Sequence, residues 1–190
     1  MPDYKLLGSN TLAVTELGGV MLQGLGYPLR SVDTSAEPEA VLIAFDDTIQ
    51  EPTTTDDPLQ VTFGPASGTS SDAVQLAADG TITFNETGFY AFLTTLKFGR
   101  QGGAGGVSNM FLRALINDIQ IGRPVATELD NSNVIIPLQF EFGLFLSAGT
   151  TVKVEIVRDS SGMDDGGIFP ATSSIGWGIS PSARMRVYKT

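Results

Sequence analysis

Short runs of strand-forming residues, separated by turn residues, recur from Val41 to the end of the chain. The clearest run covers residues 138–146, in which apolar residues alternate with polar or small ones. Its apolar positions are Leu138, Phe140, Phe142, Leu144 and Leu146. Strict alternation of this kind is typical of a strand with one buried face. Many short strands at this spacing, with no segment of helical period, predict an antiparallel sandwich or barrel.

The run FNETGFYAFLTTLKF, residues 84–98, departs from this alternation because both of its faces carry apolar side chains. The odd positions include Phe89, and the even positions include Tyr90 and Phe92. A strand that meets water on one side should alternate cleanly, so we expect both faces of this strand to be buried. The second face would be covered by another copy of the chain, or else by a loop or an N-terminal arm.

The chain divides into two regions of different character. Residues 1–38 mix small apolar patches with glycine and proline and show no sustained period, which predicts an extended N-terminal arm ahead of a β-domain over residues 39–190. Apolar segments too short to fold alone often become ordered on a partner surface. A disordered leader is the alternative. The candidate binding residues of the arm are Leu17, Val20, Met21, Leu22, Leu25, Tyr27 and Leu29.

Composition excludes several classes of function. The chain has no cysteine and no histidine, so it lacks the side chains for disulfides, for Ser-His-Asp or Cys-His catalysis and for imidazole-ligated zinc. A formal charge of −10 without a basic stripe argues against a nucleic-acid partner. No apolar run approaches the ~20 residues that span a bilayer, and no signal peptide opens the sequence, so we expect no membrane partner and synthesis in the cytoplasm.

Carboxylates are the remaining catalytic candidates. Glu86, Glu128 and Glu155 could in principle supply the acid and nucleophile of a glycosidase. Such a site needs two carboxyl groups facing each other across an aromatic-lined cleft, whereas these acids lie singly on strand exteriors or in turns. We therefore expect a protein that is not an enzyme and has no cofactor.

Two glycine-rich loops deserve separate consideration. GRQGGAGGVS, residues 99–108, is followed by a strand-like run, so a flexible loop is favoured over a phosphate-binding turn. RDSSGMDDGG, residues 158–167, gathers Asp159, Asp164 and Asp165, and oxygen-rich loops of this kind can hold calcium. Its spacing departs from the EF-hand pattern, so a solvated loop is expected, with a calcium site as the alternative.

The order of these features resembles the trimeric jelly roll of the tumour necrosis factor and complement globular-head superfamily. The resemblance rests on FNETGFYAFLTTLKF, FLRALINDIQIG and LFLSAGTTVKVEIVRDSSG and covers about residues 73–187. The signature places are held by Gly88, Tyr90, Phe92, Asn117 and Gly149. Thr150 stands where the family commonly has an acid, and Trp177-Gly178 replaces a phenylalanine-glycine pair.

The resemblance implies a homotrimer with subunits packed around a threefold axis. A strand can then bury one face in its own sandwich and the other against a neighbour, which would explain residues 84–98. The trimer-interface residues implied in this way are Phe89, Tyr90, Phe92, Leu96, Phe98 and Trp177.

ADGTITFNETGFYAF and VRDSSGMDDGG are also similar to segments of bacteriophage virion proteins that carry this jelly roll. The resemblance implies a structural virion protein, made in the host cytoplasm and placed on the capsid exterior. The expected role is capsid decoration: as a cement protein, the trimer binds the major capsid protein of the outer shell and stabilises the head. The alternative role is the receptor-binding head of a tail or head fibre.

Overall fold

The computed structural model describes residues 4–6, 10–14, 20–23, 40–66, 72–100, 106–130 and 134–189. The chain forms two compact units, Met1–Glu39 and Ala40–Thr190, which are considered separately below. Within the described ranges all regular structure is β-structure, in agreement with the sequence-based prediction. No helix among the described residues has the length and apolar character needed to cross a membrane.

In the first unit, three short strands form an antiparallel sheet in the order β1-β2-β3. They are β1 (Tyr4–Leu6), β2 (Asn10–Val14) and β3 (Val20–Gln23). These strands lie within the segment predicted to be an extended arm, and its role as a binding segment stays a prediction. Three candidate binding residues, Val20, Met21 and Leu22, belong to β3. The others, Leu17, Leu25, Tyr27 and Leu29, lie outside the described residues.

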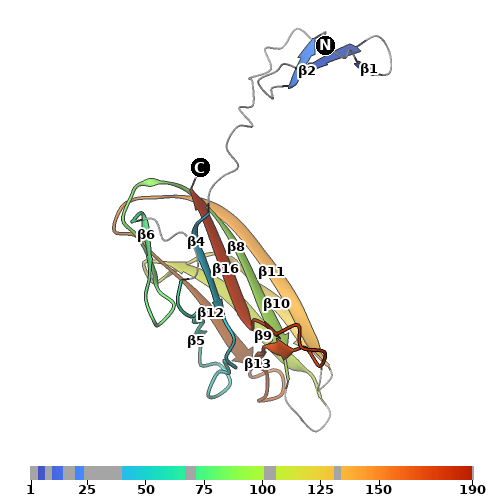
Figure 1. Ribbon diagram of the computed structural model, residues 1–190. Helices are drawn as coiled ribbons and strands as arrows, with labels where there is room; N and C mark the ends of the chain where they lie inside the picture. Colours follow the sequence, from blue (N-terminus) through green and yellow to red (C-terminus); the bar gives the residue numbers. More distant parts are fainter. Residues whose placement is uncertain are drawn as a thin grey trace. The chain divides into compact units, whose positions relative to one another are not determined.

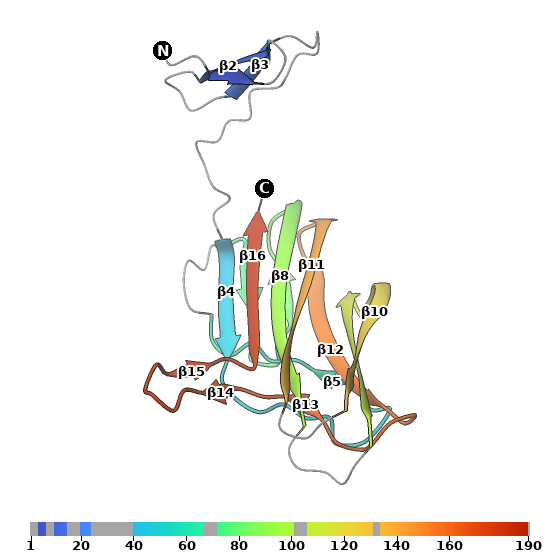
Figure 2. The same cartoon turned by 90° about the vertical axis from the view of Figure 1, so that its right-hand side faces the viewer.

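The second unit is a sandwich of two sheets (Figures 1 and 2). The first sheet has the order β11-β8-β16-β4, and β13 pairs with β8 beyond the end of β16. Its strands are β11 (Ile135–Leu146), β8 (Gly88–Gly99), β16 (Ala183–Lys189), β4 (Ala40–Asp46) and β13 (Gly167–Ile168).

The second sheet has the order β10-β9-β12-β7-β6, and β5 pairs with β12. Its strands are β10 (Ile119–Leu129), β9 (Ser108–Ile116), β12 (Thr151–Asp159), β7 (Ile82–Phe84), β6 (Val74–Leu76) and β5 (Leu59–Gln60). A separate hairpin consists of β14 (Ala171–Thr172) and β15 (Ile179–Ser180).

Strand neighbours in both sheets are antiparallel, and many are far apart in sequence. The last strand, β16, lies between β4 and β8, so Tyr188 pairs with Ala40 at one edge of the domain. Consecutive strands such as β7 and β8, or β11 and β12, belong to different sheets, so the chain crosses repeatedly between the two layers. This crossing of an antiparallel chain between two sheets is the arrangement of a jelly roll.

Strand β8 shows why residues 84–98 carry apolar side chains in both directions. Its even-numbered residues from Tyr90 to Phe98 point between the sheets and are buried, while the odd-numbered ones from Phe89 to Lys97 remain partly or largely exposed. The inward face supplies the core, and the Tyr90 hydroxyl donates a hydrogen bond of 2.8 Å to the Glu86 carbonyl. Within a single chain, the outward face of β8 is thus only partly covered by other residues.

The hairpin between β6 and β7 is closed by Asp79-Gly80, a residue pair that favours tight hairpin turns. Gly80 N–H donates to the Ala77 carbonyl at 3.0 Å, and the Asp79 carboxylate accepts a hydrogen bond from Thr81 N–H at 2.9 Å. Hydrogen bonds from Thr81 lower the pKa of Asp79 below its usual value. Gly80 has a φ of +88°, and a Cβ at this position would lie 2.0 Å from the Val61 carbonyl oxygen.

Substitution of Gly80 by alanine tests how closely this turn packs. Gly149 is the matched control, since its φ is +84° but nothing lies within 4 Å of its Cβ position. We expect Gly149→Ala to cost about 1 kcal/mol through backbone strain alone. Gly80→Ala should cost about 3 kcal/mol, because the backbone must also move. Urea unfolding at one protein concentration measures the free energy of unfolding of both variants. Equal losses of this free energy would show that the close approach of residue 80 to Val61 is unimportant.

Candidate binding surfaces

An aromatic pair lies exposed on the outward face of the first sheet. Phe89 on β8 and Phe145 on β11 are directly opposite each other, with exposed fractions of 43% and 71%. The Phe89 ring lies over Gly143, where an added Cβ would come within 2.7 Å of the ring. Because residue 143 has no side chain, the ring can extend across the neighbouring strand. The result is an apolar patch that one chain leaves open to solvent.

The same outward face also carries positive charge, although the whole chain is acidic. Arg184 and Arg186 on β16 lie opposite Thr95 and Leu93 on β8, and these four residues line a shallow hollow of about 150 Å³ together with Gln139. Among the described residues, the buried Nε of Arg186 has no hydrogen-bond partner. Two arginines thus place positive charge on the outward face of the first sheet.

Lys97, at the β13 end of the same face, extends this basic area. Its ammonium group donates to the Ser180 hydroxyl. Burial lowers the pKa of Lys97, and the negative charge of Asp47 partly opposes that shift.

A band of apolar side chains is only half buried where β10 and β11 form the edges of their sheets. The inward-facing residues of β11 pack against the core but remain partly exposed, because no other described strand continues either sheet beyond β10 or β11. They are Ile136, Leu138, Phe140, Phe142 and Leu144. Ile121 and Val125 are the half-buried apolar residues of β10. We call these seven residues the edge band.

The structure separates the residues that were predicted to form a trimer interface. Tyr90, Phe92, Leu96 and Phe98 are at most 2% exposed and pack inside the sandwich of their own chain. A neighbouring chain could reach them only by displacing their own second sheet. Phe89 and Trp177 lie at the surface. The candidate trimer interface on β8 is therefore its outward face, which carries the odd-numbered residues, and not its buried, even-numbered face.

Trp177 lies in the β14–β15 hairpin, which projects from the sandwich (Figure 2). Trp177 is 87% exposed, and its neighbours Ile175 and Ile179 are 70% and 52% exposed. The turn is ordered by its backbone, since Ser173 N–H donates to the Gly178 carbonyl at 3.0 Å. The hairpin lies at the end of the sandwich opposite the start of β4 (Figure 2). It forms a second exposed apolar surface.

The calcium alternative required Asp159, Asp164 and Asp165 to act together. Instead, Asp165 pairs with Arg100 at 2.8 Å, and Asp164 lies 3.5 Å from Arg158. Both arginine side chains are nearly fully buried, and Arg100 also donates to the Leu129 carbonyl at 3.0 Å. In the described ranges no group of three potential metal ligands is found. The acidic loop is thus attached to the end of the sandwich by two arginines.

Asp159 is satisfied within its own turn. Its carboxylate accepts a hydrogen bond from Ser161 N–H at 2.9 Å. Bonds from the hydroxyl and the N–H of Ser161 lower the pKa of Asp159.

The three glutamates considered as catalytic acids have separate surroundings. Glu86 forms an ion pair with Lys189, Glu155 forms one with Arg113 at 2.6 Å, and Glu128 is exposed on β10. The absence of enzymatic activity stays a prediction.

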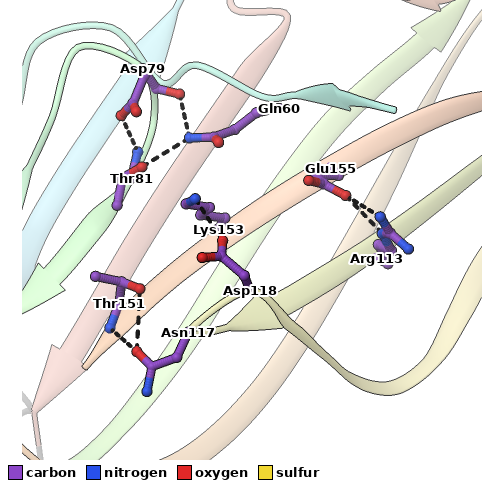
Figure 3. A network of polar contacts seen from close by, with 9 residues as sticks. All are labelled: Gln60, Asp79, Thr81, Arg113, Asn117, Asp118, Thr151, Lys153 and Glu155. Atoms are coloured by element: carbon purple, nitrogen blue, oxygen red, sulfur yellow. Dashed lines mark hydrogen bonds and ion pairs between the residues drawn. The ribbon is translucent and has the colours of Figure 1, made fainter. Parts of the chain in front are cut away.

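A network of polar contacts covers the outward face of the second sheet (Figure 3). Asn117 and Asp118 form the turn between β9 and β10 with φ angles of 47° and 66°. The Asn117 side chain accepts a hydrogen bond from Thr151 N–H at 2.9 Å, and Asp118 pairs with Lys153 at 2.7 Å. The bond to Asp118 raises the pKa of Lys153. These contacts fix the start of β12 beside the β9–β10 turn.

Comparison with known proteins adds information on the fold. No protein-family model matches the sequence, and no curated protein sequence matches it. Among solved structures, Eiger TNF from S. frugiperda is 13% identical, with a TM-score of 0.50 over 81% of this chain and 94% of that chain. The globular domain of zebrafish complement 1qA protein is 16% identical, with a TM-score of 0.43 over 81% of this chain and 100% of that chain. The predicted antiparallel, TNF-like jelly roll is confirmed.

The arginine contacts of the acidic loop lead to a prediction about calcium. Because Asp164 and Asp165 already pair with arginines, we expect the melting temperature of the full chain to be the same in excess calcium and in excess chelator. Scanning calorimetry of both samples at matched ionic strength makes this comparison. A melting temperature that rises with calcium concentration would contradict this prediction and support a calcium site in the loop.

Proposed function

We propose that the chain assembles as a homotrimer and acts as a non-enzymatic structural protein of a phage particle, as a decoration protein on the capsid exterior. The observation that carries the assembly is the apolar surface that one chain leaves uncovered. Phe89 and Phe145 lie exposed on the outward face of the first sheet, and the side chains of the edge band, on β10 and β11, are half exposed. Extended apolar surfaces of this kind usually mark an interaction site.

The two surfaces differ in shape, which bears on the type of assembly. The outward face of the first sheet is the broad side of the sandwich, whereas the edge band lies along its open edge. A contact of one copy's edge against the next copy's face is head-to-tail, and such contacts make a closed ring when the rotation between subunits closes. A ring of three is the assembly that the resemblance implies. It would cover both surfaces in every subunit.

The arm completes the proposed role in decoration. Residues 1–38 of each subunit would contact the major capsid protein, while the jelly rolls form the compact trimer. Three weak arm contacts on one trimer reinforce one another through effective concentration, so attachment requires no large individual interface. Arms bound to different coat subunits would cross-link the shell and stabilise the head.

The β14–β15 hairpin favours a second candidate function, the receptor-binding head of a tail or head fibre. Ile175 and Trp177 lie exposed on this hairpin. The hairpin is at the end of the sandwich opposite the start of β4 (Figure 2). A binding head that is attached at one end presents its partner-binding residues at the other. Immunogold labelling of purified particles separates the two roles, because a decoration protein covers the whole shell and a fibre head is confined to the fibres.

The homotrimer predicts a sedimenting mass three times the 20.1 kDa of the chain. Phe145→Ser should weaken association by at least ~10-fold, because it removes an exposed aromatic ring from the proposed contact. Ile175→Ser is the matched control, since Ile175 is equally exposed but lies on the hairpin. Analytical ultracentrifugation over a concentration series measures both. A stable single subunit at micromolar concentration would refute the assembly.

Removal of residues 1–38 tests the arm separately. We expect the shortened chain to keep the trimeric mass and the melting profile of the jelly roll, since residues 40–190 form their own compact unit. It should no longer bind capsids that lack the protein. Co-sedimentation with such capsids is the measurement, with the full chain as the control. Undiminished binding by the shortened trimer would show that the arm does not attach it.

A further inference from the structure

A trough lies on the outward face of the second sheet, the sheet that does not carry Phe89 and Phe145. Its volume is about 290 Å³, and it crosses β9 and β12. Phe111 and Val157 provide an apolar floor, and the ion pair of Arg113 and Glu155 lies beside them (Figure 3 shows the pair). The trough is complete within one chain, so it does not depend on the proposed trimer.

One wall of the trough is made by an irregularity in β10. Ile121 pairs with Ala114 and Val125 pairs with Leu112, so three residues of β10 lie opposite the single residue Arg113. Residues 122–124 bulge out of the ladder and place Pro124 along the trough. Bulges of this type often adjoin functional sites, where they redirect side chains.

The opposite wall is a loop held in an uncommon backbone conformation. Asp56 has a φ of 61°, which few residues other than glycine adopt. Its N–H donates to the Arg158 carbonyl at 2.7 Å, and its carboxylate accepts a hydrogen bond from Ser160 N–H at 2.9 Å. Pro58 continues this wall. Local strain that neighbouring contacts maintain is a recurrent property of ligand sites.

The polar groups of the trough form hydrogen bonds with one another, but some of their donors and acceptors have no partner among the described residues. Both contacts of the ion pair, Nε at 2.7 Å and Nη2 at 2.6 Å, reach the same oxygen, Glu155 Oε2. This geometry leaves the Nη1 donors of Arg113 and the second oxygen of Glu155 available to a ligand. The Gln120 amide donates only a long bond of 3.3 Å to the Gly122 carbonyl. Donors and acceptors thus lie together beside an aromatic floor.

We propose that this trough binds a neutral sugar ring. The apolar C–H face of the ring would lie on Phe111, and its hydroxyl groups would both donate to and accept from Arg113, Glu155 and Gln120. Small-molecule sites combine an apolar lining with a few fixed polar groups in the same way. The carboxylates of Asp56 and Asp159 at the rim disfavour phosphorylated or acidic ligands. The internal pairing of Arg113 and Glu155 favours an uncharged ligand over a cation.

Saturation-transfer NMR of the full chain with a panel of neutral hexoses and N-acetylhexosamines tests the proposal. At least one sugar should receive saturation. Its affinity should fall at least ~10-fold in Phe111→Ala and several-fold in Gln120→Ala, because the first loses the apolar floor and the second loses hydrogen bonds. Gln120 lies exposed on an edge strand, so its substitution leaves the core intact if Phe111→Ala does not fold.

Phe145→Ala is the matched control, since it removes an aromatic ring from the outward face of the other sheet. Sugar binding in this variant should equal that of the unaltered chain, even if its assembly changes. The proposal is overturned if no sugar of the panel binds, or if the trough variants bind as well as the control. It is also overturned if lysine amide, a cationic probe, binds there and the sugars do not. Sugar binding by a chain that stays monomeric would refute the trimer and leave this inference intact.

Discussion

The contact on which the sandwich depends is a row of aromatic rings that joins its two sheets. Phe84 of the second sheet packs edge-on against Tyr90 and Phe92 of the first, with ring centroids 4.5 and 5.7 Å apart. Phe92 in turn stacks on Phe142 at 4.3 Å. Aromatic pairs of this kind contribute about 0.5–1.5 kcal/mol each beyond the area that they bury. The row fixes which face of β8 points inward, so it also determines which residues remain for an external contact.

That row runs to the edge of the sandwich, where burial becomes incomplete. Phe142 belongs to β11, an edge strand, and is one of the residues of the edge band. Two sheets of this size leave their last strands without neighbours, and natural proteins cover or blunt such edges. Here the side chains beside the edge are apolar, which is costly in water unless a partner covers them. The core and the proposed subunit contact are therefore continuous.

The sequence predicts this fold well where local periodicity determines the structure. The alternation of residues 138–146 correctly predicted strand β11. Periodicity could not show that β11 lies at an edge, because strand order depends on contacts between distant residues. For the same reason, the even face of β8 was assigned to an interface although Phe84 and its neighbours cover it.

The candidate sites were less predictable, because each depends on residues far apart in sequence. The sequence alone left Asp165 as a possible calcium ligand, whereas in the fold its carboxylate pairs with Arg100. The trough needs a bulge in β10, the floor of β9 and β12, and a loop around Asp56, and none of these has a distinctive sequence motif. The left-handed conformation of Asp56 gave no signal, since aspartate is common in ordinary loops as well.

The pairing of Ala40 with Tyr188 has a practical consequence for engineering. Because the first and last strands of the sandwich meet at one end, a peptide fused to either would emerge beside the other. The β14–β15 turn lies at the far end and makes no ladder with either sheet, so a foreign epitope inserted there would be displayed away from both junctions. The architecture thus separates the attachment point of the domain from a permissive site for cargo.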